Sequence, residues 1–140
     1  LYVIYGKRIL TEHIEVETVQ SCKPADEMAL EKLNHLKGSK YLQRGEIKEF
    51  YVQLSYILRE YVENSVFIKT LEMTTEEIKQ YRSVIPFDRD QLSIWMDILQ
   101  RADLSKYAKS DPERMICHED LAAGETFVKN TVPSWKIQNT

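Results

Sequence analysis

The sequence has few of the residues that make turns, few cysteines and no long apolar run. Four glycines and four prolines in 140 residues are too few for a turn-rich β-sandwich. Cys22 and Cys117 are far apart and form no CxxC motif, so a reduced compartment is expected, with one long-range disulfide as the alternative. No run of about 20 apolar residues is present, so we expect no complete transmembrane helix within the sequence.

The charges and the missing motifs exclude several classes of function. The formal net charge is −3, with lysine and arginine scattered among aspartate and glutamate, whereas nucleic acid binding needs a continuous basic surface. Glycine-rich phosphate loops and a GxSxG nucleophile motif are both missing from the sequence. We therefore expect no nucleic acid partner, no cofactor and no enzymatic activity.

The strongest structural signal lies in residues 45–65. Apolar and aromatic residues recur there at spacings of three and four, which is typical of one buried face of an α-helix. The stripe consists of Ile47, Phe50, Tyr51, Leu54, Ile57, Leu58 and Tyr61. Polar side chains such as Lys48, Gln53 and Glu60 take the opposite side. This pattern predicts a central amphipathic helix that other helices must cover.

Weaker patterns predict four further helices, over residues 24–38, 74–85, 87–107 and 111–132. The first has Pro24 in its first turn and Gly38 as its stop signal. The second has Thr74 as its cap and Glu77 three positions later, which is the spacing of a capping box. The third is expected to begin with Asp88 as its cap.

The last of these helices is expected to begin with Asp111 as its cap and Pro112 at its first position. Residues 66–73 are the one stretch between helices that could add an extended piece. The predicted fold class is therefore all-α, a bundle of about five helices around the amphipathic helix at 45–65.

Several titratable residues invite a catalytic or metal-binding interpretation, but their spacing favours ordinary roles. His13, His35 and His118 lie in three different elements, without the i, i+4 pair of a zinc-binding helix, so surface positions are expected. Cys117 and His118 are adjacent, and neighbours on a helix diverge by about 100°. We therefore predict no metal site and no catalytic group.

Acidic and aromatic clusters have similar explanations. The pair Glu76 and Glu77 is better explained by stabilisation of a helix start than by acid–base catalysis. Tyr51, Tyr61 and Tyr81 follow the apolar stripes, which favours packing in the core over an aromatic surface for bases or sugars. Neither cluster predicts a binding site.

The stretch ADLSKYAK, residues 102–109, leaves two interpretations open. In the first, Asp103 caps a local turn by accepting hydrogen bonds from the amides of Ser105 or Lys106, and Tyr107 packs inward where the chain changes direction. In the second, Asp103, Lys106 and Tyr107 form a docking site for a protein partner. The residues favour the structural interpretation, and the docking site is the one candidate functional site.

Several segments also carry a resemblance to a known family. They are PADEMALEKLNHLK, LREYVE followed by TLEMTTEEI, LQRADLSKYAK and FVKNT. Through them, residues 24–132 resemble the carboxy-terminal cytoplasmic region of BatD-like membrane proteins and their relatives of unknown function in Bacteroidetes. In that family the helical region follows a transmembrane helix, and the genes lie among those for MoxR-type AAA ATPases and von Willebrand A domain proteins. The family has no established enzymatic motif.

This resemblance also predicts the structure of the first residues. Residues 1–8, LYVIYGKR, would be the end of the membrane helix, with Lys7 and Arg8 as its cytoplasmic basic flank; a strand is the alternative. Residues 9–23 would be a linker, 24–132 the helical domain and 133–140 a tail. Since there is no initial Met and no outer domain, the resemblance implies part of a longer protein.

The function implied by the resemblance is a non-catalytic interaction domain on the cytoplasmic side of the bacterial inner membrane. Its partners would be MoxR-type AAA ATPases and von Willebrand A domain proteins. The alternative, from another class, is a small enzyme or ligand-binding domain with a site built from Tyr, Asp and Lys side chains of different helices. A concave pocket with perturbed carboxylates would favour that alternative.

Overall fold

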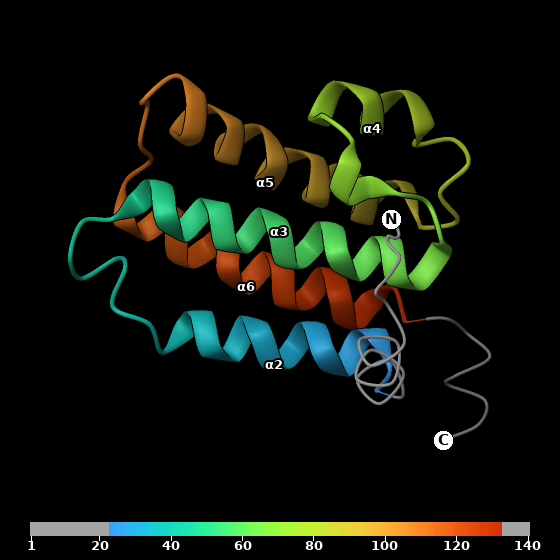
Figure 1. The fold of residues 1–140 in the computed structure, drawn as a ribbon, viewed down its shortest axis with the longest axis horizontal. Helices are drawn as coiled ribbons and strands as arrows, with labels where there is room; N and C mark the ends of the chain where they lie inside the picture. Colours follow the sequence, from blue (N-terminus) through green and yellow to red (C-terminus); the bar gives the residue numbers. More distant parts are fainter. Residues whose placement is uncertain (1–22, 133–140) are drawn as a thin grey trace, which may run out of the picture.

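The computed structural model describes residues 23–132, which form five α-helices and one short 3-10 helix (Figure 1). The α-helices are α2 (Ala25–Lys37), α3 (Ile47–Val66), α4 (Thr75–Tyr81), α5 (Arg89–Tyr107) and α6 (Arg114–Asn130), and the 3-10 helix is η1 (Thr70–Glu72). No strand occurs in residues 23–132. The predicted all-α bundle of about five helices is therefore confirmed.

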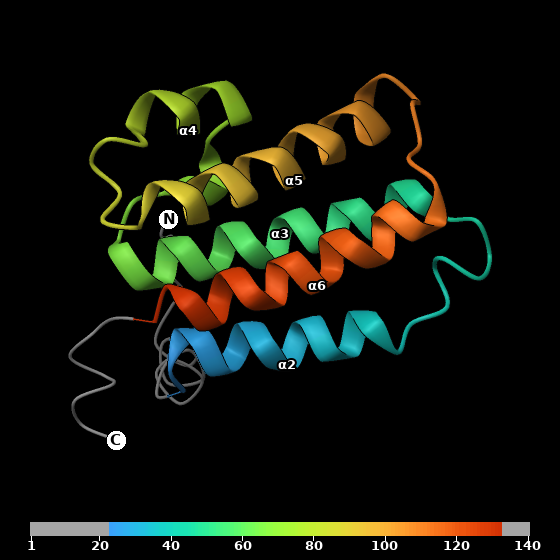
Figure 2. The same ribbon diagram turned by 180° about the vertical axis from the view of Figure 1, so that it is seen from behind.

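The four long helices are arranged around one parallel pair. α3 and α6 lie side by side, with α5 on one side of the pair and α2 on the other (Figures 1 and 2). Successive long helices run in opposite directions, so α3 and α6, separated by α5 in sequence, run the same way. The short helix α4 packs on the outside of α5. The core is the space shared by α3, α5 and α6, together with the face of α2 that covers α3.

Gly124 of α6 faces α3 within the parallel pair. A Cβ atom built on Gly124 would lie 3.5 Å from the nearest side-chain atoms of both Leu54 and Leu58. That distance is ordinary van der Waals contact, so an alanine would fit at this position. The packing of α6 on α3 therefore does not require the glycine.

The predicted buried face of the central helix is confirmed. All seven residues of the stripe are buried in α3, namely Ile47, Phe50, Tyr51, Leu54, Ile57, Leu58 and Tyr61. Burying an aliphatic or aromatic side chain stabilises a fold by roughly 1.5–3 kcal/mol. α3 alone touches α2, η1, α5 and α6, so its stripe is the centre of the core.

The predicted helix starts are confirmed in part. α4 has the expected capping box, because Thr74 Oγ1 accepts from the amide of Glu77 (3.1 Å) and the Glu77 carboxylate accepts from the amide of Thr74 (2.9 Å). Pro24 occupies the N-cap position of α2, just before the first turn, and Gly38 follows the last residue as predicted. Asp88 occupies the N-cap position of α5 but makes no side-chain capping bond.

The expected start of the last helix is wrong. α6 begins at Arg114 with Glu113 at its N-cap, so Asp111 and Pro112 precede the helix. The Asp111 carboxylate instead accepts a hydrogen bond from Ser105 Oγ of α5 (2.7 Å). A side chain that could have capped its own helix is thus used to tie the α5–α6 connection to α5.

Two further expectations are corrected around α4. Residues 66–73 contain η1 and no extended strand, because the Thr70 hydroxyl donates to the carbonyl of Arg59 (2.6 Å) and draws the segment onto α3. Tyr81 is 48% exposed, although the apolar pattern placed it in the core. α4 has only seven residues, packs mainly on α5 and receives one hydrogen bond from α3, from Arg59 Nη2 to Thr75 Oγ1 (3.3 Å). Tyr81 is its last residue, at the end of this short helix.

The predictions for the two ends of the chain fall outside the described residues. These predictions are the membrane-helix end at 1–8, the linker up to Cys22 and the tail at 133–140. Between residues 23 and 132, every helix is too short or too polar to cross a membrane.

Candidate functional site

A buried polar network joins the three helices of the core. Asp120 of α6 lies inside the bundle, where its carboxylate accepts a hydrogen bond from Tyr51 Oη of α3 (2.6 Å). Arg101 of α5 donates to both oxygens of the same carboxylate, from Nε (2.8 Å) and from Nη2 (2.6 Å). Charge-assisted bidentate bonds of this kind are the strong and directional ones. We call Tyr51, Arg101 and Asp120 the core triad.

The surroundings of the core triad hold Tyr51 and Arg101 in their protonated states. Burial, followed by the hydrogen bond to Asp120, raises the pKa of Tyr51, so the phenol stays protonated and donates. The hydrogen bonds to Asp120 raise the pKa of Arg101, against the opposing effect of burial. Burial also raises the pKa of the neighbouring Cys117 thiol. These groups are arranged to hold helices together rather than to exchange protons near neutral pH.

The adjacent Cys117 and His118 lie as expected for ordinary helix positions. Cys117 is buried beside Tyr51, whereas His118, the next residue along α6, is exposed. His35 is likewise exposed, on α2. Among residues 23–132, no three or more His, Cys, Asp or Glu side chains gather as a metal site.

A second set of polar contacts links α3 to the carboxy-terminal end of α5. Lys106 Nζ contacts Ser55 Oγ of α3 (3.4 Å), which in turn donates to the carbonyl of Val52 (3.3 Å). The Lys106 side chain is only 12% exposed, and its ammonium lies 3.9 Å from the Asp103 carboxylate. Burial lowers the pKa of Lys106, the charge of Arg59 lowers it further, and Asp103 acts in the opposite direction.

The structure places the predicted docking residues together on the last turns of α5. Asp103 lies within the helix and contacts Lys106, so the predicted local turn capped by Asp103 is wrong. Tyr107 is 79% exposed, so its predicted inward packing is also wrong. The Lys106 ammonium lies 5.5 Å from the centroid of the Tyr107 ring, within the range of a cation–π contact. Half-exposed Leu104 adds an apolar side chain. We call Asp103, Leu104, Lys106 and Tyr107 the α5 end.

The backbone after the α5 end is also fixed. The carbonyl of Leu104 accepts from the amides of both Ala108 (3.0 Å) and Ser110 (3.1 Å), and Lys109 between them is left-handed, with φ 52°. The bond from Ser105 to Asp111 then ties the next residues back to the helix. The exposed residues of the α5 end therefore lie on a helix terminus that several hydrogen bonds hold in one conformation.

Sequence reasoning missed Arg101, Asp120, Ser55 and Leu104. One signal was present for Asp120, because it falls among the apolar positions of its helix, which continue through Leu121, Gly124 and Phe127. A charged residue in such a stripe needs a buried partner. The partner itself could not be named, because Arg101 lies on a different helix, 19 residues away in sequence.

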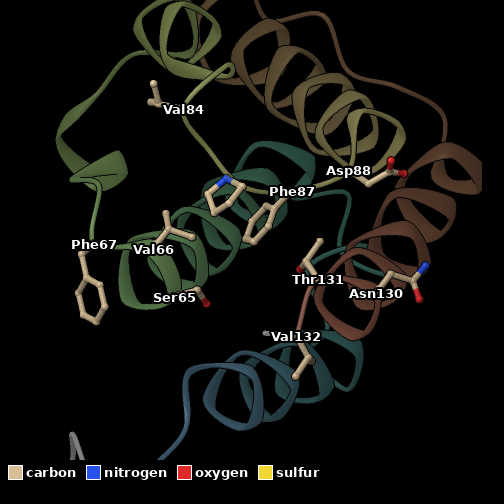
Figure 3. Close-up of a pocket in the computed structure, with 10 residues that line it drawn as sticks. Ser65, Val66, Phe67, Val84, Phe87, Asp88, Asn130, Thr131 and Val132 are labelled. Atoms are coloured by element: carbon tan, nitrogen blue, oxygen red, sulfur yellow. The ribbon is translucent and has the colours of Figure 1, made fainter. Parts of the chain in front are cut away.

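The surface of residues 23–132 has at least three grooves, and the core triad lines none of these three. A groove of about 670 Å³ lies where α3 and α6 end, beside the segment that leads into α5 (Figure 3). A smaller one of about 420 Å³ lies between α2 and α3 and includes His35, Tyr41 and Tyr56. The buried carboxylate of Asp120 thus faces helices rather than any of these concave surfaces.

Comparisons with protein families, curated proteins and solved structures give no match to this chain.

Proposed function

We propose that this chain is a non-catalytic interaction domain of a membrane-anchored, BatD-like protein, and that it docks partner proteins through the α5 end. The observation that carries the proposal is the exposure of Tyr107 and Leu104 beside a Lys106 ammonium that is held in place from two sides. Aromatic side chains on a rigid element are typical anchors of protein interfaces, because they bury a large area at low cost in conformational entropy.

Each residue of the α5 end has a role in this proposal. Tyr107 is the anchor that a partner would cover, and Leu104 extends its apolar surface. Lys106 stays within the domain, where Asp103 and Ser55 orient its ammonium under the Tyr107 ring. A partner that covers Tyr107 would therefore also shield this charge from water, which strengthens its interactions.

The identity of the partners comes from the resemblance to BatD-like proteins. It implies a MoxR-type AAA ATPase or a von Willebrand A domain protein, met on the cytoplasmic side of the bacterial inner membrane. In this proposal residues 1–8 are the end of the membrane anchor and residues 9–23 the linker, with Lys7 and Arg8 on the cytoplasmic side.

The test is an affinity purification of the full-length membrane protein from its native cells, with and without Tyr107→Ala. We expect the wild type to recover the AAA ATPase or the von Willebrand A protein, and the Tyr107→Ala variant to lose most of that recovery. Tyr81→Ala is the matched control, because Tyr81 is half-exposed and lies on α4, outside the α5 end. Both variants should melt within a few degrees of the wild type, since neither ring is buried in the core.

Two results would contradict the proposal. Recovery of neither protein by the wild type would remove the partners that the resemblance implies. Equal recovery by the wild type and both variants would show that docking uses another face.

A further inference from the structure

The groove where α3 and α6 end lies at the opposite end of the bundle from the α5 end. Three segments contribute its walls: residues 65–67 at the end of α3, residues 84–88 before α5, and residues 130–132 at the end of α6. Figure 3 shows Ser65 and Phe87 facing the side chains of Thr131 and Val132 across this space. The groove therefore gathers parts of the chain that are distant in sequence.

The rim of the groove leaves large apolar side chains uncovered. Phe67 is 87% exposed, and Val84 is also exposed. Phe67 adopts a left-handed conformation, with φ 62°, while its amide closes α3 by donating to the carbonyl of Glu63 (2.9 Å). This conformation is unfavourable for a residue with a bulky side chain, and it turns the phenyl ring outward beside the groove instead of into the core.

The groove also offers polar groups that the described residues do not satisfy. Ser65 Oγ is shielded from solvent and has no hydrogen-bond partner within residues 23–132. Asp88 leaves its carboxylate unused as a cap of α5. An occupant with a backbone to bond Ser65 and a positive charge to meet Asp88 would complement both groups.

The chain itself leaves the described structure from the wall of this groove. The Thr131 hydroxyl donates to the carbonyl of Phe127 (2.7 Å) and lies 2.8 Å from Tyr61 Oη, which fixes the direction of the exit. Val132 lines the groove, and PSWKIQNT follows it. Trp135 is three residues beyond Val132, so it can lie no further than about 10 Å from it.

We infer that the groove is the binding site of the chain's own carboxy-terminal residues 133–140, with Trp135 as its apolar anchor. Trp135 and Ile137 supply apolar side chains that can cover Phe67 and Val84 of the rim, and Lys136 supplies the charge opposite to that of Asp88. A tether of three residues gives Trp135 an effective concentration on the order of millimolar or above at the groove, so even a weak contact would be occupied. This inference is independent of the proposed docking at the α5 end.

Tryptophan fluorescence of the full chain tests the inference, because Trp95 and Trp135 are its only tryptophans. The difference between the wild type and Trp135→Phe isolates the emission of Trp135, since Trp95 is fully buried and remains in both. We expect Trp135 to emit at shorter wavelength than free tryptophan and to be protected from acrylamide. Emission and quenching equal to those of free tryptophan would overturn the inference.

Paired surface variants locate the contact. Phe67→Ser should abolish most of the protection of Trp135, whereas Met115→Ser, which changes an exposed side chain at the far end of α6, should leave it unchanged. Equal protection in both variants would show that Trp135 is buried elsewhere. Protection that disappears on dilution would show that the groove holds the tail of a second copy, which would also overturn binding within one chain.

Discussion

The interface of α3, α5 and α6 is built from two different kinds of contact at its two ends. Toward the groove, aromatic rings fill it: Trp95 stacks on Phe127 with ring centroids 5.8 Å apart, and Tyr61 and Phe87 meet Phe127 edge to face at 5.9 and 5.8 Å. Toward the α5 end, the core triad of Tyr51, Arg101 and Asp120 joins the same helices by hydrogen bonds.

The two ends contribute different properties to the fold. Ring packing buries much apolar area, but it tolerates small shifts because contacts between carbon atoms have little directionality. The bonds of the core triad would all break if α6 moved by one residue relative to α3 and α5, because they converge on the single carboxylate of Asp120. We infer that the aromatic end supplies most of the stability, and that the polar end fixes how the helices are aligned.

The largest effect is expected from removing the centre of the aromatic end. Phe127→Ala should lower the free energy of unfolding by about 3–5 kcal/mol, through lost burial and a cavity between Tyr61, Phe87 and Trp95. Met115→Ala is the matched control, because that side chain lies on the same helix but is 69% exposed and should change stability by less than about 0.5 kcal/mol. Urea melts measure both values, and similar losses would mean that the aromatic end is not the main source of stability.

A smaller loss in the free energy of unfolding is expected from a substitution in the core triad. Asp120→Ala leaves the buried hydroxyl of Tyr51 and the guanidinium of Arg101 without their partner. We expect a loss of about 2–3 kcal/mol, less than for a fully buried ion pair, because the Arg101 side chain is 37% exposed. Glu119→Ala, at the exposed neighbouring position, should be nearly neutral. A loss as small as that of the control would show that the core triad is not a buried interaction.

The smallest effect, and the most specific one, is expected from the hydroxyl of Tyr51. Tyr51→Phe removes one hydrogen bond and should cost about 1 kcal/mol at neutral pH. The folded state raises the pKa of Tyr51, so the folded chain keeps a proton that the unfolded chain loses above about pH 10. Wild-type stability should therefore fall as the pH rises beyond that point.

Urea melts at several alkaline pH values check this dependence. The decline should be clearly smaller in Tyr51→Phe, while Tyr56→Phe, which changes a half-exposed tyrosine on the same helix, should decline like the wild type. Identical pH profiles for all three proteins would mean that the Tyr51 hydroxyl is not shielded as its hydrogen bond to Asp120 implies.

The sequence by itself determined the helices and the buried face of the longest one. Periodicity sufficed for α3, because other helices surround its stripe on both sides and every position from Ile47 to Tyr61 on that face is covered. Local chemistry sufficed for the Thr74 and Glu77 capping box, because both partners lie within one turn. Interactions between residues close in the chain leave a pattern that can be read without the fold.

Only the tertiary structure decided which side chains next to the apolar stripes are buried. It also decided which polar groups form hydrogen bonds with one another. Tyr81 follows an apolar pattern and Tyr107 is predicted to pack inward, but both remain exposed. The width of the covered face depends on the neighbouring helices and not on the helix itself. Asp111 bonds Ser105 rather than capping α6. The core triad brings together residues 51, 101 and 120. These outcomes depend on how separate helices are placed relative to one another. Because the contacting residues are distant in sequence, no local pattern indicates which of them will pair.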